Sequence, residues 1–140
     1  MEKSRELPWE PSAQRRGPIE IRMPADPELV SAMRLTASAM AATRKCTIAE
    51  IDDIRLAVSE VLLALIEHGS GQQLAVSMEL ADSTFAISAC TETSTFDRNH
   101  PNLTLCETVL AEVCSDHSIE LAGSELRIGA DVHLDRRDDR

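Results

Sequence analysis

Apolar and polar residues alternate in four stretches of the chain, which is the period of a strand with one buried face. The first stretch is Ile19-Glu20-Ile21-Arg22-Met23, and Pro24 ends it. Residues 74–80 and 85–89 alternate on either side of the turn Ala81-Asp82-Ser83, so they predict an antiparallel hairpin. The last stretch covers residues 126–134, and a short further strand near residues 118–121 is left open.

Three other stretches have the spacing of helices. Asp26 before Pro27 is typical of a helix start, and a helix to about Arg44 follows. The face of this helix predicted to be buried carries Leu29, Met33, Thr36 and Met40, with Ala37 beside them. A second helix begins at the capping box Thr47-Ile48-Ala49-Glu50 and ends at Gly69 and Gly71. Its predicted core stripe is Ile51, Ile54, Val58, Val61, Leu62 and Leu65. A third helix over residues 103–114 has a weaker signal, because it contains two threonines.

The resulting order, β-α-α-β-β-α-β, predicts an α+β two-layer sandwich, in which helices cover one face of a mostly antiparallel sheet. A chain of 140 residues with 43% hydrophobic content has enough apolar surface for one compact core. We therefore expect one domain at residues 17–134, preceded by a flexible arm at residues 1–16 and followed by a charged tail at residues 135–140.

Composition narrows the classes of partner. The formal net charge of −10 disfavours nucleic acids and anionic membranes and favours protein partners. No stretch approaches the roughly 20 apolar residues that span a bilayer. The four cysteines form no C-x-x-C pair, and no apolar signal segment follows the first methionine. We expect a cytoplasmic protein with reduced thiols.

Glu60, Ala64 and His68 form one row along the second helix, because they are spaced four residues apart. We predict that this row lies opposite the core stripe, where a carboxylate and an imidazole would suit a general base in phosphoryl transfer. A solvated helix face that ends in a surface histidine has the same spacing.

Cys106, Cys114 and His117 suggest a metal set, but two cysteines on one helix face are also typical of packing. Structural zinc sites usually have four ligands in paired spacings. We therefore expect no metal site.

The run from Ile54 to Glu60, followed by Glu67-His68-Gly69, resembles the second helix of the anti-sigma-factor serine kinases. These proteins share an ATPase fold with gyrase and the histidine kinases. In that family the helix carries a glutamate that acts as general base and an asparagine that holds the nucleotide's magnesium. Glu60, His68 and Gly69 match the family pattern. Ala64 stands at the asparagine position and has no oxygen for a hard cation.

The second family motif, D-x-G-x-G-F-D, corresponds to residues 91–97, of which Phe96 and Asp97 match. The resemblance makes Thr91 the counterpart of the adenine-binding aspartate, and Thr93 and Thr95 those of the two glycines. The third motif, a glycine-rich lid, would fall at residues 102–105, which contain no glycine. The nucleotide site implied by the family is therefore vestigial here, at Glu60, Ala64, His68, Thr91, Thr93 and Thr95. We expect no cofactor, with ATP and magnesium bound only if the protein is an active kinase.

The resemblance covers residues 17–134. It implies an anti-sigma factor, usually a homodimer, that binds and sequesters a sigma factor and is itself captured by an anti-anti-sigma factor. We expect this function without kinase activity. One alternative is an active serine-protein kinase that phosphorylates an anti-anti-sigma factor, with Glu60 as its base. A second alternative is a scaffold that binds only anti-anti-sigma proteins.

The family presents an arginine on the outer side of the first helix to its partner, and Arg34 matches that position. The predicted partner-binding residues are Glu28, Arg34, Leu35 and Ser38. A surface arginine beside a leucine that the N-terminal arm covers is the alternative. On the second helix, Leu56 and Leu63 flank Glu60, and we expect the loop of residues 91–102 to cover them.

Overall fold

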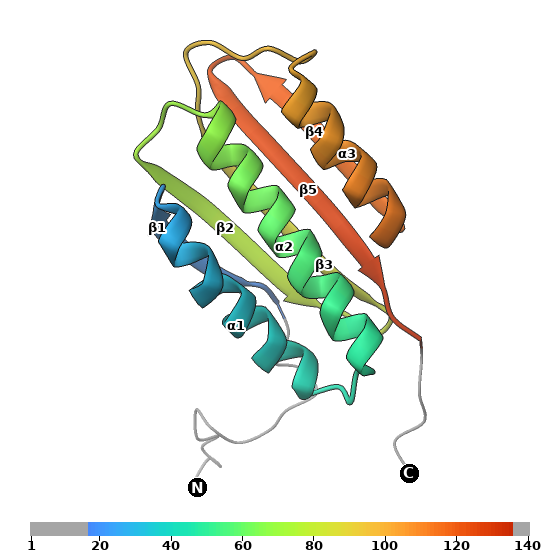
Figure 1. The fold of residues 1–140 in the computed structure, drawn as a ribbon. Coiled ribbons are helices and arrows are strands. Elements are labelled where there is room, and N and C mark those ends of the chain that lie inside the picture. The colour runs from blue at the N-terminus through green and yellow to red at the C-terminus, as the bar shows by residue number, and fades with distance from the viewer. Residues whose placement is uncertain (1–16, 136–140) are drawn as a thin grey trace, which may run out of the picture.

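A computed structural model describes residues 17–135, which form an antiparallel sheet with all helices on one face (Figure 1). The strands lie in the order β1-β2-β3-β5-β4. Their bounds are β1 Ile19–Pro24, β2 Gln73–Leu80, β3 Thr84–Glu92, β4 Asp116–Ala122 and β5 Glu125–His133. The predicted arm at residues 1–16 and the tail beyond residue 135 lie outside the described residues.

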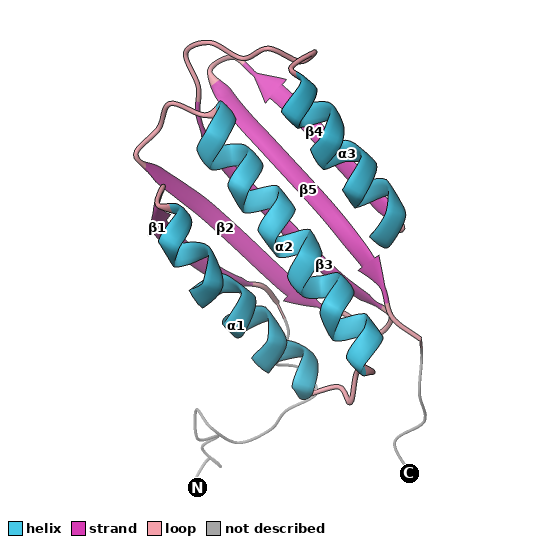
Figure 2. Cartoon of the chain, in the orientation of Figure 1, coloured by secondary structure: helices cyan, strands magenta, loops and turns pink. Residues whose placement is uncertain are grey.

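Three α-helices and one 3-10 turn make up the second layer (Figure 2). Their bounds are η1 Pro27–Leu29, α1 Val30–Ala42, α2 Ile48–His68 and α3 Pro101–Val113. The middle helix, α2, packs over β3 and β5 and contacts α1 on one side and α3 on the other. No helix in residues 17–135 is long and apolar enough to cross a membrane.

The strand register places apolar side chains in rows across the sheet. One row pairs Val76 on β2 with Ala89 on β3, and Ala89 with Ile128 on β5. It extends to both edges, through Ile21 on β1 and Ile119 on β4. Because successive strand residues point to opposite faces, the alternation in sequence puts this row against the helices. The predicted two-layer α+β sandwich is confirmed.

Several predicted elements have different bounds, and two of the differences have a local cause or change the sheet. The short strand near residues 118–121 is a strand of seven residues, β4, which pairs with β5 along its whole length. The third helix begins at Pro101, two residues earlier than predicted, because His100 caps it by accepting a hydrogen bond from the amide of Asn102.

The buried face predicted for the first helix is partly wrong. Asp26 caps the 3-10 turn η1, and the α-helix begins only at Val30. A 3-10 turn has three residues per turn instead of 3.6, so it shifts the phase of the helix that follows. Val30 is therefore buried and Leu29 is 37% exposed. The buried residues of α1 are Val30, Met33, Ala37 and Ala41, while Thr36 and Met40 are half-buried.

Substitution of Leu62 on α2 tests which residues form the hydrophobic core. Its side chain is fully buried between the helix and the sheet, so Leu62→Ala should lower the free energy of unfolding by about 2–5 kcal/mol. Leu35→Ala on α1 is the matched control, because Leu35 is 73% exposed and the change should stay within about 0.5 kcal/mol. Urea denaturation followed by circular dichroism measures both. Equal losses would contradict this assignment of the core.

Candidate functional site

The row of Glu60, Ala64 and His68 lies beneath α3. Ala64 is 6% exposed and belongs to the hydrophobic core, and the side chain of His68 is only 8% exposed. The prediction that this row lies away from the core was wrong, because the side of α2 that carries it is also covered. The inner face of α2 packs on the sheet, one flank contacts α1, and the row lies on the flank that contacts α3.

Two contacts join α3 to the polar edge of α2. The side-chain amide of Asn102 donates a hydrogen bond of 2.6 Å to the carboxylate of Glu67. The thiol of Cys106 donates to the main-chain oxygen of Glu60 over 3.6 Å. Between the helices remains a groove of about 210 Å³, lined by Glu60, Leu63, Ala64, Glu67, Leu105 and Cys106 among others. We call it the α2–α3 groove.

Burial in this groove changes the acidity of two groups. Desolvation raises the pKa of the Glu60 carboxyl above its ordinary value. Burial, together with the negative charge of Glu60, raises the pKa of the Cys106 thiol to about 12. Cys106 is therefore protonated at neutral pH and is not a nucleophile, whereas Glu60 has the raised pKa that suits a general base.

The threonines at the end of β3 are held by hydrogen bonds within the protein. The hydroxyl of Thr91 donates to the main-chain oxygen of Gln73 at 2.9 Å, and that of Thr93 donates to the main-chain oxygen of His68 at 3.0 Å. Both side chains are buried, while Thr95 is exposed. These bonds tie the end of β3 to β2 and to the last residue of α2.

Gly69 and Gly71 allow Thr91 to approach the end of α2. A Cβ atom at either glycine would lie 2.4 Å from the side chain of Thr91. The φ angle of Gly69 is −88°, which any residue can adopt. Close packing against Thr91, and not a left-handed backbone, is therefore the reason for a glycine at the end of this helix.

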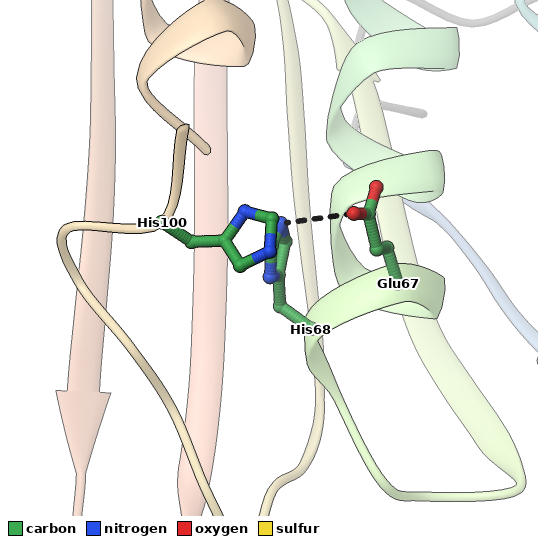
Figure 3. Close-up of side chains that lie close together, drawn as sticks. All are labelled: Glu67, His68 and His100. Atoms are coloured by element: carbon green, nitrogen blue, oxygen red, sulfur yellow. Dashed lines mark ion pairs between the residues drawn. The ribbon is translucent and has the colours of Figure 1, made fainter. Parts of the chain in front are cut away.

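Glu67, His68 and His100 converge at the C-terminal end of α2 (Figure 3). The ring centroids of the two histidines are 5.0 Å apart in an edge-to-face arrangement, and His68 Nε2 is 4.0 Å from Glu67 Oε2. A pocket of about 570 Å³ opens beside them, lined also by Phe96 and Asp97. We call it the loop pocket. Sequence reasoning missed His100, although a histidine directly before a proline at a helix start was a usable signal.

Cys106, Cys114 and His117 do not form a ligand group. Among residues 17–135, Glu67, His68 and His100 are the only set of three or more potential ligands whose donor atoms all lie within 4.8 Å of one another. Burial raises the pKa of Cys114 to about 11, which is consistent with a packed and protonated thiol.

The predicted partner-binding residues lie on η1 and α1, apart from the α2–α3 groove. Leu35 is 73% exposed, and Glu28 is also exposed. Arg34 is half-buried, because its guanidinium donates a hydrogen bond of 3.0 Å to the hydroxyl of Ser59 on α2. The hydroxyl of Ser38 donates to the main-chain oxygen of Arg34. Only part of this predicted set is therefore available to a partner in the observed arrangement.

Leu56 and Leu63 are each 40% exposed. The prediction that residues 91–102 cover them was wrong. Residues 91 and 92 continue β3, residues 101 and 102 belong to α3, and the segment between them packs at the end of α2. Leu56 therefore remains exposed on α2, and Leu63 is exposed at the α2–α3 groove.

A family model described as the histidine kinase-like ATPase domain matches residues 23–124. Serine-protein kinase RsbW from Bacillus subtilis is 42% identical over 50 residues, which are 36% of this chain and 31% of that protein. Serine-protein kinase RsbW from Bacillus velezensis is 40% identical over 50 residues, with the same coverage. The match thus spans less than a third of the length of these relatives.

The fold is similar to that of the histidine kinase AdeS from Acinetobacter baumannii. The TM-score is 0.50 at 11% sequence identity, and the similarity covers 84% of this chain and 68% of that one. At this identity the likeness concerns the fold alone.

The ion pair between Arg98 and Glu107 joins the loop before α3 to that helix, and its contribution to stability can be tested. Two hydrogen bonds, of 2.8 and 3.0 Å, join the guanidinium to the carboxylate and lower the pKa of Glu107 below its ordinary value of 4.5. A lowered pKa in the folded state means that the pair stabilises the protein at neutral pH. This stabilisation is lost as the pH falls below about 4.5.

Arg98→Gln should therefore lower stability at pH 7 by less than about 1 kcal/mol, because the pair is partly exposed. The difference from the original protein should shrink as the pH falls below about 4.5. Urea midpoints at a series of pH values measure it. Arg55→Gln, at an exposed arginine on α2, should show no such pH dependence. A pH-independent effect of Arg98→Gln would argue against a role for the ion pair.

Proposed function

Since the chain belongs to the family of histidine kinase-like ATPase domains, we propose that it uses this fold as a protein-binding regulator. In this proposal the protein is an anti-sigma factor that binds and sequesters a sigma factor, without kinase activity. The pattern of α2, which resembles that of the anti-sigma-factor serine kinases, and the similarity to serine-protein kinases RsbW support it.

The observation that carries the proposal is the burial of Ala64 beneath α3. The family resemblance assigns this position to the asparagine that holds magnesium. A methyl group cannot bind a hard cation, which requires oxygen ligands. The residues present at this position therefore do not fit a magnesium-bound triphosphate.

The contacts of Thr91 and of the segment at the lid position also support loss of nucleotide binding. Thr91 stands where the family has the aspartate that binds adenine. Its hydroxyl already donates a hydrogen bond to the main-chain oxygen of Gln73. The segment at the lid position lies in the first turn of α3, where the main-chain amides of Asn102, Leu103 and Thr104 donate to His100.

The exposed surface of α1 is the partner site in this proposal. Leu35 projects from it with 73% exposure, and large apolar side chains are frequent anchors of protein interfaces. Arg34 lies beside it and would extend the site if its bond to Ser59 opened. Association as a homodimer, capture by an anti-anti-sigma factor and a cytoplasmic location, where sigma factors act, complete the proposal.

One observation favours an active serine-protein kinase as the alternative. Glu60 is retained, it lines the α2–α3 groove, and desolvation raises its pKa as a general base requires. Phosphorylation of an anti-anti-sigma factor would then need a magnesium site built from residues other than Ala64. A scaffold that binds anti-anti-sigma proteins alone, without a sigma factor, would use the same outer surface of α1.

Nucleotide binding distinguishes the proposal from the kinase alternative. Calorimetric titration with ATP at millimolar concentration and excess magnesium should give no saturable binding, because position 64 lacks an oxygen ligand. A serine-protein kinase RsbW assayed in parallel serves as the positive control. Saturable binding together with transfer of phosphate to an anti-anti-sigma protein would refute the proposal.

Partner binding tests the surface of α1. Leu35→Asp and Arg34→Glu should each weaken binding to a sigma factor by about 1 kcal/mol or more, as expected of interface anchors. Glu60→Ala should leave binding nearly unchanged, because Glu60 lies in the α2–α3 groove. Each sigma factor encoded in the same genome is tested by biolayer interferometry.

Leu121→Asp is the matched surface control, since Leu121 is 49% exposed on the edge strand β4. Thermal melts of each variant separate lost binding from lost folding, which matters for Arg34 because it bonds to Ser59. If Glu60→Ala weakened binding more than the α1 variants, the groove would be the functional site. Binding to anti-anti-sigma proteins alone would favour the scaffold.

A further inference from the structure

We propose that Glu67, His68 and His100 form a binding site for a divalent transition metal ion, with zinc as the preferred probe. Among residues 17–135 these are the only three potential ligands whose donor atoms all lie within 4.8 Å of one another. They come from two separate segments, the end of α2 and the cap of α3. The proposal concerns a site that no sequence motif indicated, and it does not depend on the proposed anti-sigma function.

The donor atoms need only a small contraction to bind one ion. Atoms bound to a single tetrahedral zinc lie about 3.4 Å apart, because each bond to nitrogen or oxygen is about 2.1 Å long. His68 Nε2 is 4.0 Å from Glu67 Oε2, and no pair in the set exceeds 4.8 Å. Side-chain rotations that move each donor atom by about one ångström close this difference.

The three ligands are held in place by hydrogen bonds to other residues. Asn102 donates to the carboxylate of Glu67, and the main-chain oxygen of His68 accepts from the hydroxyl of Thr93. The main-chain amide of His100 donates to the oxygen of Asp97 at 3.2 Å. Contacts of this kind limit the ordering that metal binding requires, since they keep the backbone of each ligand in position.

His100 links metal binding to the start of α3. Its Nδ1 accepts a hydrogen bond from the amide of Asn102, so the neutral ring carries its proton on Nε2 and must change tautomer to bind a metal ion through that atom. A neutral imidazole bound through Nε2 carries its proton on Nδ1, where it can no longer accept this bond. Metal binding at His100 therefore replaces the cap of α3 with a metal link between α2 and α3.

The residues around the three ligands leave one coordination position of a bound cation open. The loop pocket beside the set admits solvent, and Asp97 lines it. A water molecule or Asp97 would complete four ligands, as in zinc sites with three protein ligands. The chain's net charge of −10 attracts cations in general, but two imidazoles select a transition metal over magnesium or calcium, which prefer oxygen ligands.

Calorimetric titration of the full chain, without a histidine tag, with zinc chloride tests the proposal. We expect one saturable event per chain and a rise in melting temperature with zinc concentration. His100→Asn is the sharpest variant, because asparagine is among the best N-cap residues and so preserves α3 while removing the imidazole. Glu67→Gln keeps an oxygen for the bond to Asn102 and removes the charge. Each should lower zinc affinity about tenfold or more.

His133→Asn is the matched control, since His133 is an exposed histidine on β5 outside the set. Its zinc affinity should equal that of the original protein. Substitution by cobalt, followed by visible absorption, should give bands for imidazole and carboxylate ligands without a thiolate charge-transfer band. The absence of saturable binding, an unchanged affinity in His100→Asn, or a thiolate band would each overturn the proposal.

Discussion

The packing of α2 between the sheet, α1 and α3 is the constraint on which the rest of the structure depends. Its inner face packs on β3 and β5, and α3 covers the face that carries Ala64. A small side chain at position 64 lets the two helices approach closely at this point. An asparagine at the same depth would need a hydrogen-bond partner beneath α3, because a buried amide without one is costly. The alanine at position 64 and the packing of α3 are therefore parts of one arrangement.

That arrangement also separates the two surfaces for which functions are proposed. The outer side of α1 carries Leu35 and faces away from the α2–α3 groove, so it can bind a protein whatever the groove contains. At the other site, packing of α3 on α2 brings His100 beside Glu67 and His68. In these two proposals, one face serves a protein partner and one end of α2 serves a metal ion. The two can be altered independently by mutation.

The chain has the fold of its family, although its sequence departs from the resembled nucleotide motifs at Ala64, Thr91, Thr93 and Thr95. The likeness to a histidine kinase at 11% identity rests on strand register and helix packing, which many apolar residues satisfy. Nucleotide chemistry has stricter needs, because an oxygen ligand, a carboxylate for adenine and flexible glycines each require a particular residue. Thr91 illustrates the difference: its hydroxyl now bonds to Gln73 and stabilises the end of β3. The residue at this position thus contributes to packing at the end of β3.

Local sequence determined the elements and the fold class, because a strand's alternation and a helix's spacing depend only on neighbouring residues. The hairpin of β2 and β3, the capping box at Thr47 and the matched residues Glu60 and His68 could all be identified in this way. Only the tertiary structure decided what covers each face. The sequence placed Ala64 on an outer face and Leu56 under a loop, whereas packing buries the first and exposes the second. Packing also brings His100 close to Glu67, although the two residues are 33 positions apart. No local pattern encodes this proximity, because it arises only when two helices pack together.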